Sequence, residues 1–145
     1  MGKVRTVKEP GKEVGKYKDL ADEPFLLVEE AALGIPASAV NEMVGMTRLS
    51  KEYFAGILDL STRTLDRYQK EKKKLNQAGS ELILKMISVF KLGEKVFGNN
   101  KEFRRWLESP AYGLGNRKPL DLMHSSTGMD LLKNELSRIA FGDLA

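Results

Sequence analysis

Apolar side chains recur every three or four residues along most of this chain, which is the spacing of amphipathic helices. The first such run covers residues 25–33 and stops at Gly34, a residue that suits the left-handed position after a helix. The next run carries Val40, Met43 and Val44 on one face. No segment alternates apolar and polar residues as a half-buried strand does, so the sequence predicts an all-α fold.

Three polar residues stand directly before apolar runs and are predicted to cap helices. They are Ser50, Ser61 and Asn76, and they predict helices that end near residues 58, 70 and 97. A side-chain oxygen at such a position accepts a hydrogen bond from an amide that the first turn leaves free. Gly98 is expected to end the third of these helices.

A smaller unit follows Gly98. Asn99 or Asn100 precedes a short helix that contains Trp106, and a loop over residues 111–118 leads to a turn of helix. We expect Thr127 to cap the last helix. Residues 1–24 contain few large apolar side chains and are predicted to form a flexible basic arm. The chain then divides into this arm, a domain over 25–97 and a small helical domain over 98–145.

Residues 50–70 have the spacing of a helix-turn-helix, in which a small residue lies where the two helices touch. Here that residue is Ala55, the turn residue four positions later is Asp59, and Leu65 locks the second helix to the first. The pattern resembles the helix-turn-helix of phage-repressor-type transcription factors. Those proteins usually have glycine at the turn, but aspartate also tolerates left-handed backbone. In such motifs the second helix enters the major groove of DNA.

Positive charge is concentrated at this motif. The net charge is +4, and residues 48–74 hold eight basic and four acidic side chains, so the rest of the chain is balanced. Localised positive charge favours a polyanionic partner. Arg63 or Arg67 could contact guanine, and Asp66 could accept from cytosine or orient one of these arginines. The predicted DNA-binding residues are Ser61, Thr62, Arg63, Arg67, Lys70, Lys72 and Lys73.

The composition argues against an enzyme. The chain has no cysteine and one histidine, so cysteine-based and histidine-rich metal sites are excluded. His124 stands beside three hydroxyl residues, which leaves a nucleophile–base pair as an alternative, but hydroxyls before a helix more often cap it. The glycine-containing segment 113–118 lacks a preceding strand and is interpreted as a turn. We therefore expect no catalytic residues, metal or cofactor. No apolar run approaches the ~20 residues of a membrane helix, and no signal peptide is present, so a cytoplasmic protein is expected.

Residues 97–145 carry several short motifs in a fixed order. They are RRWL at 104–107, LG at 114–115, PLDL at 119–122 and RIAFG at 138–142. This combination resembles the C-terminal domain of the Xre/MbcA/ParS antitoxins, and the upstream stretch is similar to their Xre-type helix-turn-helix domain. Members commonly have a second glycine where this chain has Asn116, and asparagine also adopts left-handed backbone.

The resemblance implies a type II toxin–antitoxin function. Such an antitoxin binds a cognate RES-domain toxin, an enzyme that degrades NAD, and blocks its active site with the antitoxin's C-terminal segment. The toxin-binding residues would be Arg138, Phe141, Gly142, Asp143, Leu144 and Ala145. The family also implies a homodimer within a larger complex that represses its own operon at an inverted repeat. The alternative is a stand-alone helix-turn-helix regulator whose C-terminal unit dimerises or senses a ligand.

Overall fold

The computed structural model describes residues 12–20 and 22–142, and this part of the chain contains eight α-helices and no strand. The predicted all-α class is confirmed. Two short 3-10 helices, Tyr112–Leu114 and Pro119–Leu122, connect the last two α-helices. The α-helices are α1 (Lys12–Asp19), α2 (Pro24–Leu33), α3 (Ser38–Thr47), α4 (Lys51–Leu58), α5 (Thr62–Lys70), α6 (Gln77–Phe97), α7 (Asn100–Leu107) and α8 (Ser126–Ala140).

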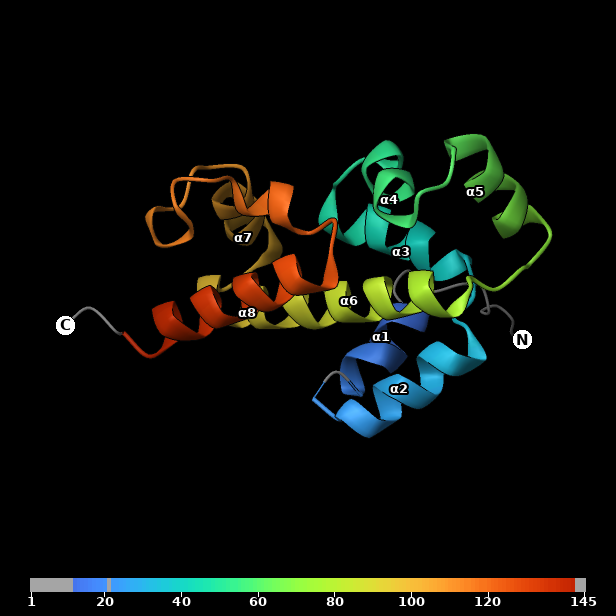
Figure 1. Cartoon of the computed structure of the whole chain (residues 1–145), viewed down its shortest axis with the longest axis horizontal. Coiled ribbons are helices and arrows are strands. Elements are labelled where there is room, and N and C mark those ends of the chain that lie inside the picture. The colour runs from blue at the N-terminus through green and yellow to red at the C-terminus, as the bar shows by residue number, and fades with distance from the viewer. Residues whose placement is uncertain (1–11, 21, 143–145) are drawn as a thin grey trace, which may run out of the picture.

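The long helix α6 forms the axis of the molecule. Figure 1 shows α1 and α2 below it, α3, α4 and α5 above it, and α8 running alongside its second half. Residues Ile83, Met86 and Ile87 of α6 are buried in a core that is continuous through both halves of the chain. The same helix therefore supports the helix-turn-helix and the C-terminal unit.

The caps predicted from sequence begin three helices where expected. Ser50 Oγ accepts from the Tyr53 amide at 3.0 Å, Ser61 Oγ from the Thr64 amide at 3.0 Å, and Asn76 Oδ1 from the Gly79 amide at 2.7 Å. Gly98 ends α6 with a φ of 93°, as predicted.

The prediction for the cap of the last helix is wrong by two residues. The Oγ atom of Ser125, not that of Thr127, accepts from the Gly128 amide, at 2.9 Å. Ser125, Ser126 and Thr127 all carry hydroxyls, so residue type alone does not separate them. The amide that Ser125 caps belongs to Gly128, where a Cβ would overlap the Leu122 carbonyl oxygen, so only glycine fits there.

The expectation of a flexible arm is wrong for residues 12–19, which form α1. Val14 and Tyr17 are buried against the rest of the protein, and α1 packs on α3 and α6. The carboxylate of Glu42, on α3, accepts from the amides of Glu13 at 3.1 Å and Val14 at 2.9 Å. A side chain from another helix thus satisfies the first turn of α1. Residues 1–11 lie outside the described part of the chain.

An aromatic cluster fastens α7 to α6. The Phe103 ring is fully buried and lies 5.0 Å from the Phe90 ring and 6.0 Å from the Trp106 ring, measured between centroids. Phe103 also packs directly on Gly93 of α6, where a Cβ would lie only 2.5 Å from Cδ1 of the ring and nearer still to Cε2 and Cζ. The absence of a side chain at residue 93 is what allows α7 to approach so closely.

Within residues 12–20 and 22–142, no helix is both long and apolar enough to cross a lipid bilayer.

Candidate nucleic-acid interface and C-terminal surface

Helices α4 and α5 pack as the sequence spacing predicts. Ala55 and Leu65 are buried between them, and Asp59 adopts left-handed backbone with a φ of 56°. The Leu60 amide donates to the Ala55 carbonyl at 2.9 Å, which closes the end of α4. Aspartate therefore takes the conformation that glycine usually supplies in this motif.

The predicted basic residues of α5 share one exposed side of the helix. Arg63, Arg67 and Lys70 stand three or four residues apart and carry their charges away from the core, which Leu65 faces. The Ser61 hydroxyl caps α5, and Thr62, the first residue of the helix, is half-buried. In the part of the chain that the structure describes, Arg63 makes no ion pair, so its guanidinium is available to a ligand.

Asp66, the one acid on this side of α5, has a different partner from the one expected. Its Oδ1 pairs with the Lys51 ammonium at 2.6 Å, across the two helices of the motif. The two arginines are not its partners. The pair compensates the negative charge of Asp66 near the predicted DNA surface, so the carboxylate repels phosphate less than the sequence alone suggests.

The loop after α5 is held in place by backbone hydrogen bonds. The Lys73 carbonyl accepts from the Ala37 amide at 3.0 Å, and the Leu75 amide donates to the Ile35 carbonyl at 2.8 Å. Lys73 and Arg67 place their charged groups 5.1 Å and 5.6 Å from the centre of the Tyr68 ring. Lys72 is exposed in left-handed backbone with a φ of 58°. The backbone hydrogen bonds therefore fix the positions from which the loop lysines project.

At the other end of the molecule, Arg138 is bound to a buried acid. Its Nε and terminal nitrogen donate to the two Glu135 carboxylate oxygens at 3.0 Å and 2.5 Å. Glu135 is itself buried and lies against Gly113, where a Cβ would come within 2.5 Å of Oε1 and closer still to Oε2. Arg138 therefore helps to hold the 112–114 turn against α8, in addition to any contact it makes with a partner.

The end of α8 exposes an apolar side chain. Phe141 is 86 % exposed, and Gly142 follows in left-handed backbone with a φ of 62°. The Phe141 ring is therefore accessible to a partner, as are the rings of Phe25 and Tyr112. The predicted toxin-binding residues Asp143, Leu144 and Ala145 lie outside the described residues.

His124 is the base of the alternative nucleophile–base pair considered from the sequence. His124 is exposed, and its ring meets the Tyr53 ring edge-on with a centroid distance of 5.1 Å. Across the described residues, no hydrogen bond joins His124 to a hydroxyl or a carboxylate, and no cluster of acids and histidine has the composition of a metal site. The Tyr53 hydroxyl donates to the Leu120 carbonyl at 2.6 Å. The pKa of Tyr53 is raised above its usual value, mainly because the hydroxyl is buried and also because the negative charge of Asp121 is close.

The glycine-containing segment 113–118 is a turn, as interpreted from sequence. Ala111 and Arg117 pair across it, and Gly115 and Asn116 both adopt left-handed backbone. The φ of Asn116 is 61°, so asparagine adopts the left-handed backbone that was expected at this position.

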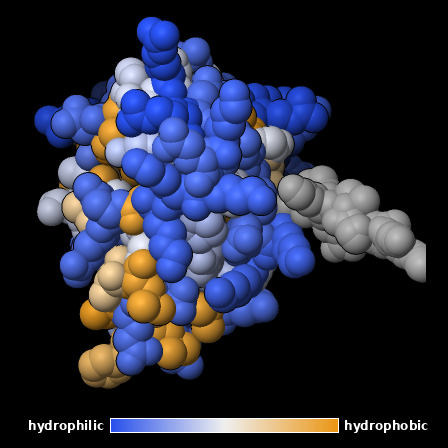
Figure 2. Space-filling model, turned by 90° about the vertical axis from the view of Figure 1, so that its right-hand side faces the viewer, coloured by the Kyte–Doolittle hydropathy of each residue, from blue (hydrophilic) through white to orange (hydrophobic). Residues whose placement is uncertain are grey.

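A surface that sequence analysis missed lies on α2. Phe25, Val28 and Leu33 are well exposed, and Figure 2 shows apolar atoms gathered at the lower end of the molecule, away from the hydrophilic upper end. These side chains follow no simple helical stripe, because the apolar residues of α2 surround the helix on most sides.

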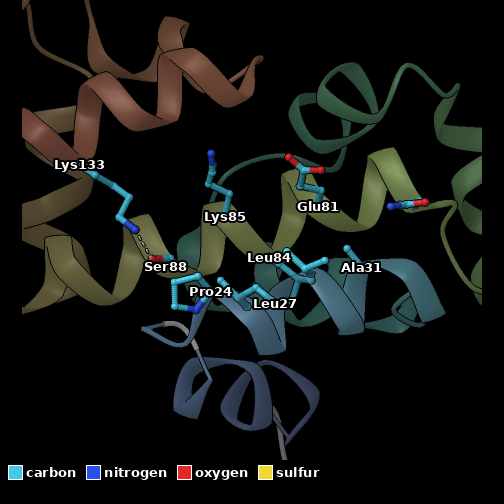
Figure 3. Close-up of a pocket in the computed structure, with 10 residues that line it drawn as sticks. Pro24, Leu27, Ala31, Glu81, Leu84, Lys85, Ser88 and Lys133 are labelled. Carbon is cyan, nitrogen blue, oxygen red and sulfur yellow. Dashed lines mark hydrogen bonds between the residues drawn. The ribbon is translucent and has the colours of Figure 1, made fainter.

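A hollow of about 310 Å³ opens beside this surface, between α2, α6 and α8. In Figure 3, Pro24, Leu27 and Leu84 line it, and Lys133 reaches Ser88 Oγ at its edge, with an N–O distance of 2.8 Å. Three helices that are distant in sequence build this hollow, so no local pattern could reveal it.

Comparisons with known families and structures agree with this arrangement. Residues 27–88 match the antitoxin Xre-like helix-turn-helix domain, and residues 92–142 match the antitoxin Xre/MbcA/ParS C-terminal toxin-binding domain. The fold is similar to a chain in the crystal structure of the M. tuberculosis MbcT–MbcA toxin–antitoxin complex, with a TM-score of 0.55 and 22 % identity. That match covers 73 % of this chain and 94 % of the other. No curated protein matches the sequence.

A helix-turn-helix joined through one long helix to a toxin-binding domain defines the class of the protein, which is an antitoxin of a toxin–antitoxin system. Within that class, the chain belongs to the Xre/MbcA/ParS antitoxins, because both of their domains match in order. The resemblance noted in the sequence is thereby confirmed.

Proposed function

We propose that this antitoxin neutralises a RES-domain, NAD-degrading toxin by placing its C-terminal segment in the toxin's active site. The observation that carries the proposal is the exposed Phe141 at the end of a helix in the toxin-binding domain. Phe141 and Leu144 can fill an apolar pocket, while Asp143 and the terminal carboxylate can pair with basic groups that hold cofactor phosphates. The antitoxin acts by occupying the site and is not itself an enzyme.

The test is co-expression with the product of the neighbouring gene, followed by copurification and measurement of cellular NAD. Deletion of residues 140–145, or Phe141→Asp, is expected to abolish protection of NAD and of growth. The matched control is Leu131→Asp, because Leu131 is an exposed apolar residue on the same helix, 48 % exposed but ten positions earlier. Full protection by the deletion variant would refute the C-terminal mode of inhibition.

We further propose that the protein represses its own operon, with α5 in the major groove. The outward-facing Arg63 and Arg67 support base contacts, and Lys70, Lys72 and Lys73 support contacts to flanking phosphates. An inverted repeat would be read by a homodimer with half-sites one helical turn apart, ~34 Å. This activity places the protein in the cytoplasm, where the operator lies.

Binding to duplex DNA from the region upstream of its gene tests this second activity. The double variant Arg63→Ala, Arg67→Ala is expected to lose ~1–3 kcal/mol of sequence discrimination for each bidentate contact removed. Toxin binding by the same variant is the internal control and should not change. Equal DNA affinity before and after substitution would place DNA recognition elsewhere.

A further inference from the structure

A second cluster of positive charge lies where the helix-turn-helix domain meets the toxin-binding domain. A hollow of about 440 Å³ opens between the end of α3 and the start of α7. Arg48, Lys101 and Arg104 line it, together with Met46, Thr47 and Asn100, and no carboxylate does. Over residues 12–20 and 22–142, none of these three cations has an ion-pair partner. Three uncompensated charges around one hollow attract an anion.

The two helix ends that carry these charges are tied together. The side-chain Nδ2 atom of Asn100 donates to the Met46 carbonyl at 3.3 Å, which joins the start of α7 to the end of α3. Thr47 Oγ1 donates to the Met43 carbonyl at 2.7 Å and accepts from the Leu49 amide at 3.1 Å. The cations therefore project from a fixed backbone, which lowers the entropic penalty of binding a ligand.

Arg48 stands in a backbone conformation that disfavours it. Its φ is 64°, in the left-handed region, where a side chain other than glycine costs about 1–2 kcal/mol. Glycine would fit this position at the end of α3 without that penalty. Backbone strain of this kind is often found at binding sites, and the arginine places its charge at the edge of the hollow.

One cation of the hollow lies close in sequence to the start of α4, which is the first helix of the helix-turn-helix. Arg48 is two residues before Ser50, the cap of α4. When α5 enters the major groove, the first helix of the motif crosses the backbone, and its amino-terminal end is suited to phosphate. A phosphate near the start of α4 is therefore within the field of Arg48 and of its neighbours on α7.

We propose that Arg48, Lys101 and Arg104 form a second site for DNA backbone phosphates, so that the toxin-binding domain itself contacts the operator through α7. The inference rests on the proposed DNA binding and adds to it a contact surface outside the helix-turn-helix. Its consequence is that α7 makes the operator affinity depend on the C-terminal domain.

The test measures the affinity of the full chain for its upstream DNA over a series of salt concentrations. Lys101→Ala with Arg104→Ala is expected to reduce the slope of log affinity against log salt by ~0.9 for each phosphate that is no longer neutralised, which is close to two for the pair. The matched control is Arg105→Ala: Arg105 is on the same helix, does not line the hollow, and is paired with Glu102 at 3.6 Å. The control should keep the wild-type slope.

Arg48→Gly separates binding from folding. Glycine adopts left-handed backbone without strain, so this variant should be at least as stable to heat as the wild type. It should nevertheless bind DNA more weakly, and the slope of log affinity against log salt should be lower by ~0.9. Wild-type slopes in both the α7 variant and Arg48→Gly, with DNA still bound, would overturn the second site and leave the proposed repression intact. A wild-type protein that does not bind its upstream DNA at all would overturn both proposals.

Discussion

The contact between Gly93 and Phe103 leads to a quantitative prediction about how α7 is held on α6. In Gly93→Ala, the new methyl group would lie 2.5 Å or less from three ring carbons of Phe103, whereas ordinary contacts begin near 3.4 Å. The ring cannot simply move aside, because Phe90, Phe97 and Trp106 surround it at centroid distances of 5.0–6.0 Å. The substitution must displace α7 or distort the cluster.

The free energies involved can be compared directly. Overpacking a dense core costs about 1–3 kcal/mol, and the severity of this contact favours the upper end. Replacing glycine by alanine inside a helix stabilises the fold by about 1 kcal/mol through helix propensity. The net loss is therefore about 2 kcal/mol, which corresponds to a fall in the melting temperature of about 6 °C for a domain of this size.

The assay is thermal unfolding followed by circular dichroism and by fluorescence. Trp106 is the only tryptophan of the chain and lies in the same cluster, 5.5 Å from the Phe97 ring, so its emission reports this contact. Gly45→Ala is the matched control, because Gly45 is within α3 and a Cβ there would meet no atom within 4 Å. The control should raise the melting temperature by ~2–3 °C, since it gains helix propensity without a clash. A Gly93→Ala protein that melts no lower than wild type, with unchanged emission, would refute the packing argument.

Three further substitutions test other parts of the structure. Asp59→Gly should raise the melting temperature by a few degrees, because glycine adopts left-handed backbone without strain and a negative charge is removed from the carboxyl end of α4. A fall in the melting temperature would show that the Asp59 side chain makes a stabilising contact. Tyr53→Phe should lower the free energy of unfolding at pH 7 by about 1 kcal/mol, because it removes the hydrogen bond to the Leu120 carbonyl. Folding raises the pKa of Tyr53, so the stabilisation by its protonated hydroxyl is complete below pH ~10 and is lost as the pH rises further. The free energy of unfolding of Tyr53→Phe should therefore depend less on alkaline pH than that of wild type. An identical pH dependence of the two proteins would contradict this reasoning. His124→Ala should leave toxin neutralisation intact, and loss of neutralisation with unchanged helicity would reopen a functional role for that ring.

Sequence reasoning succeeded where the deciding interaction is local. Ser50, Ser61 and Asn76 each cap the helix that begins directly after them, and the hydrogen bond spans only three residues. The left-handed backbone of Asp59 and Asn116 was also predictable, because it depends on the residue's own side chain.

The failures involve partners that are distant in the chain. Helix α1 was missed because its first amides are satisfied by Glu42, which is 28 and 29 residues away. Lys51 was not identified as the partner of Asp66 for the same reason, since the two residues belong to different helices. The hollow at Arg48 needs α3 and α7 to meet, and no pattern within either helix predicts that contact.

The use of α6 by both halves has an evolutionary consequence. Its side chains contact α1 and α2 as well as α7 and α8, so neither half has a complete interior without it. A lineage that exchanges its C-terminal portion to match a new toxin must keep the Gly93 side of α6 compatible with the incoming aromatic residues. Divergence of such proteins should therefore proceed more readily by change at exposed tips, such as Phe141, than by wholesale recombination at the junction.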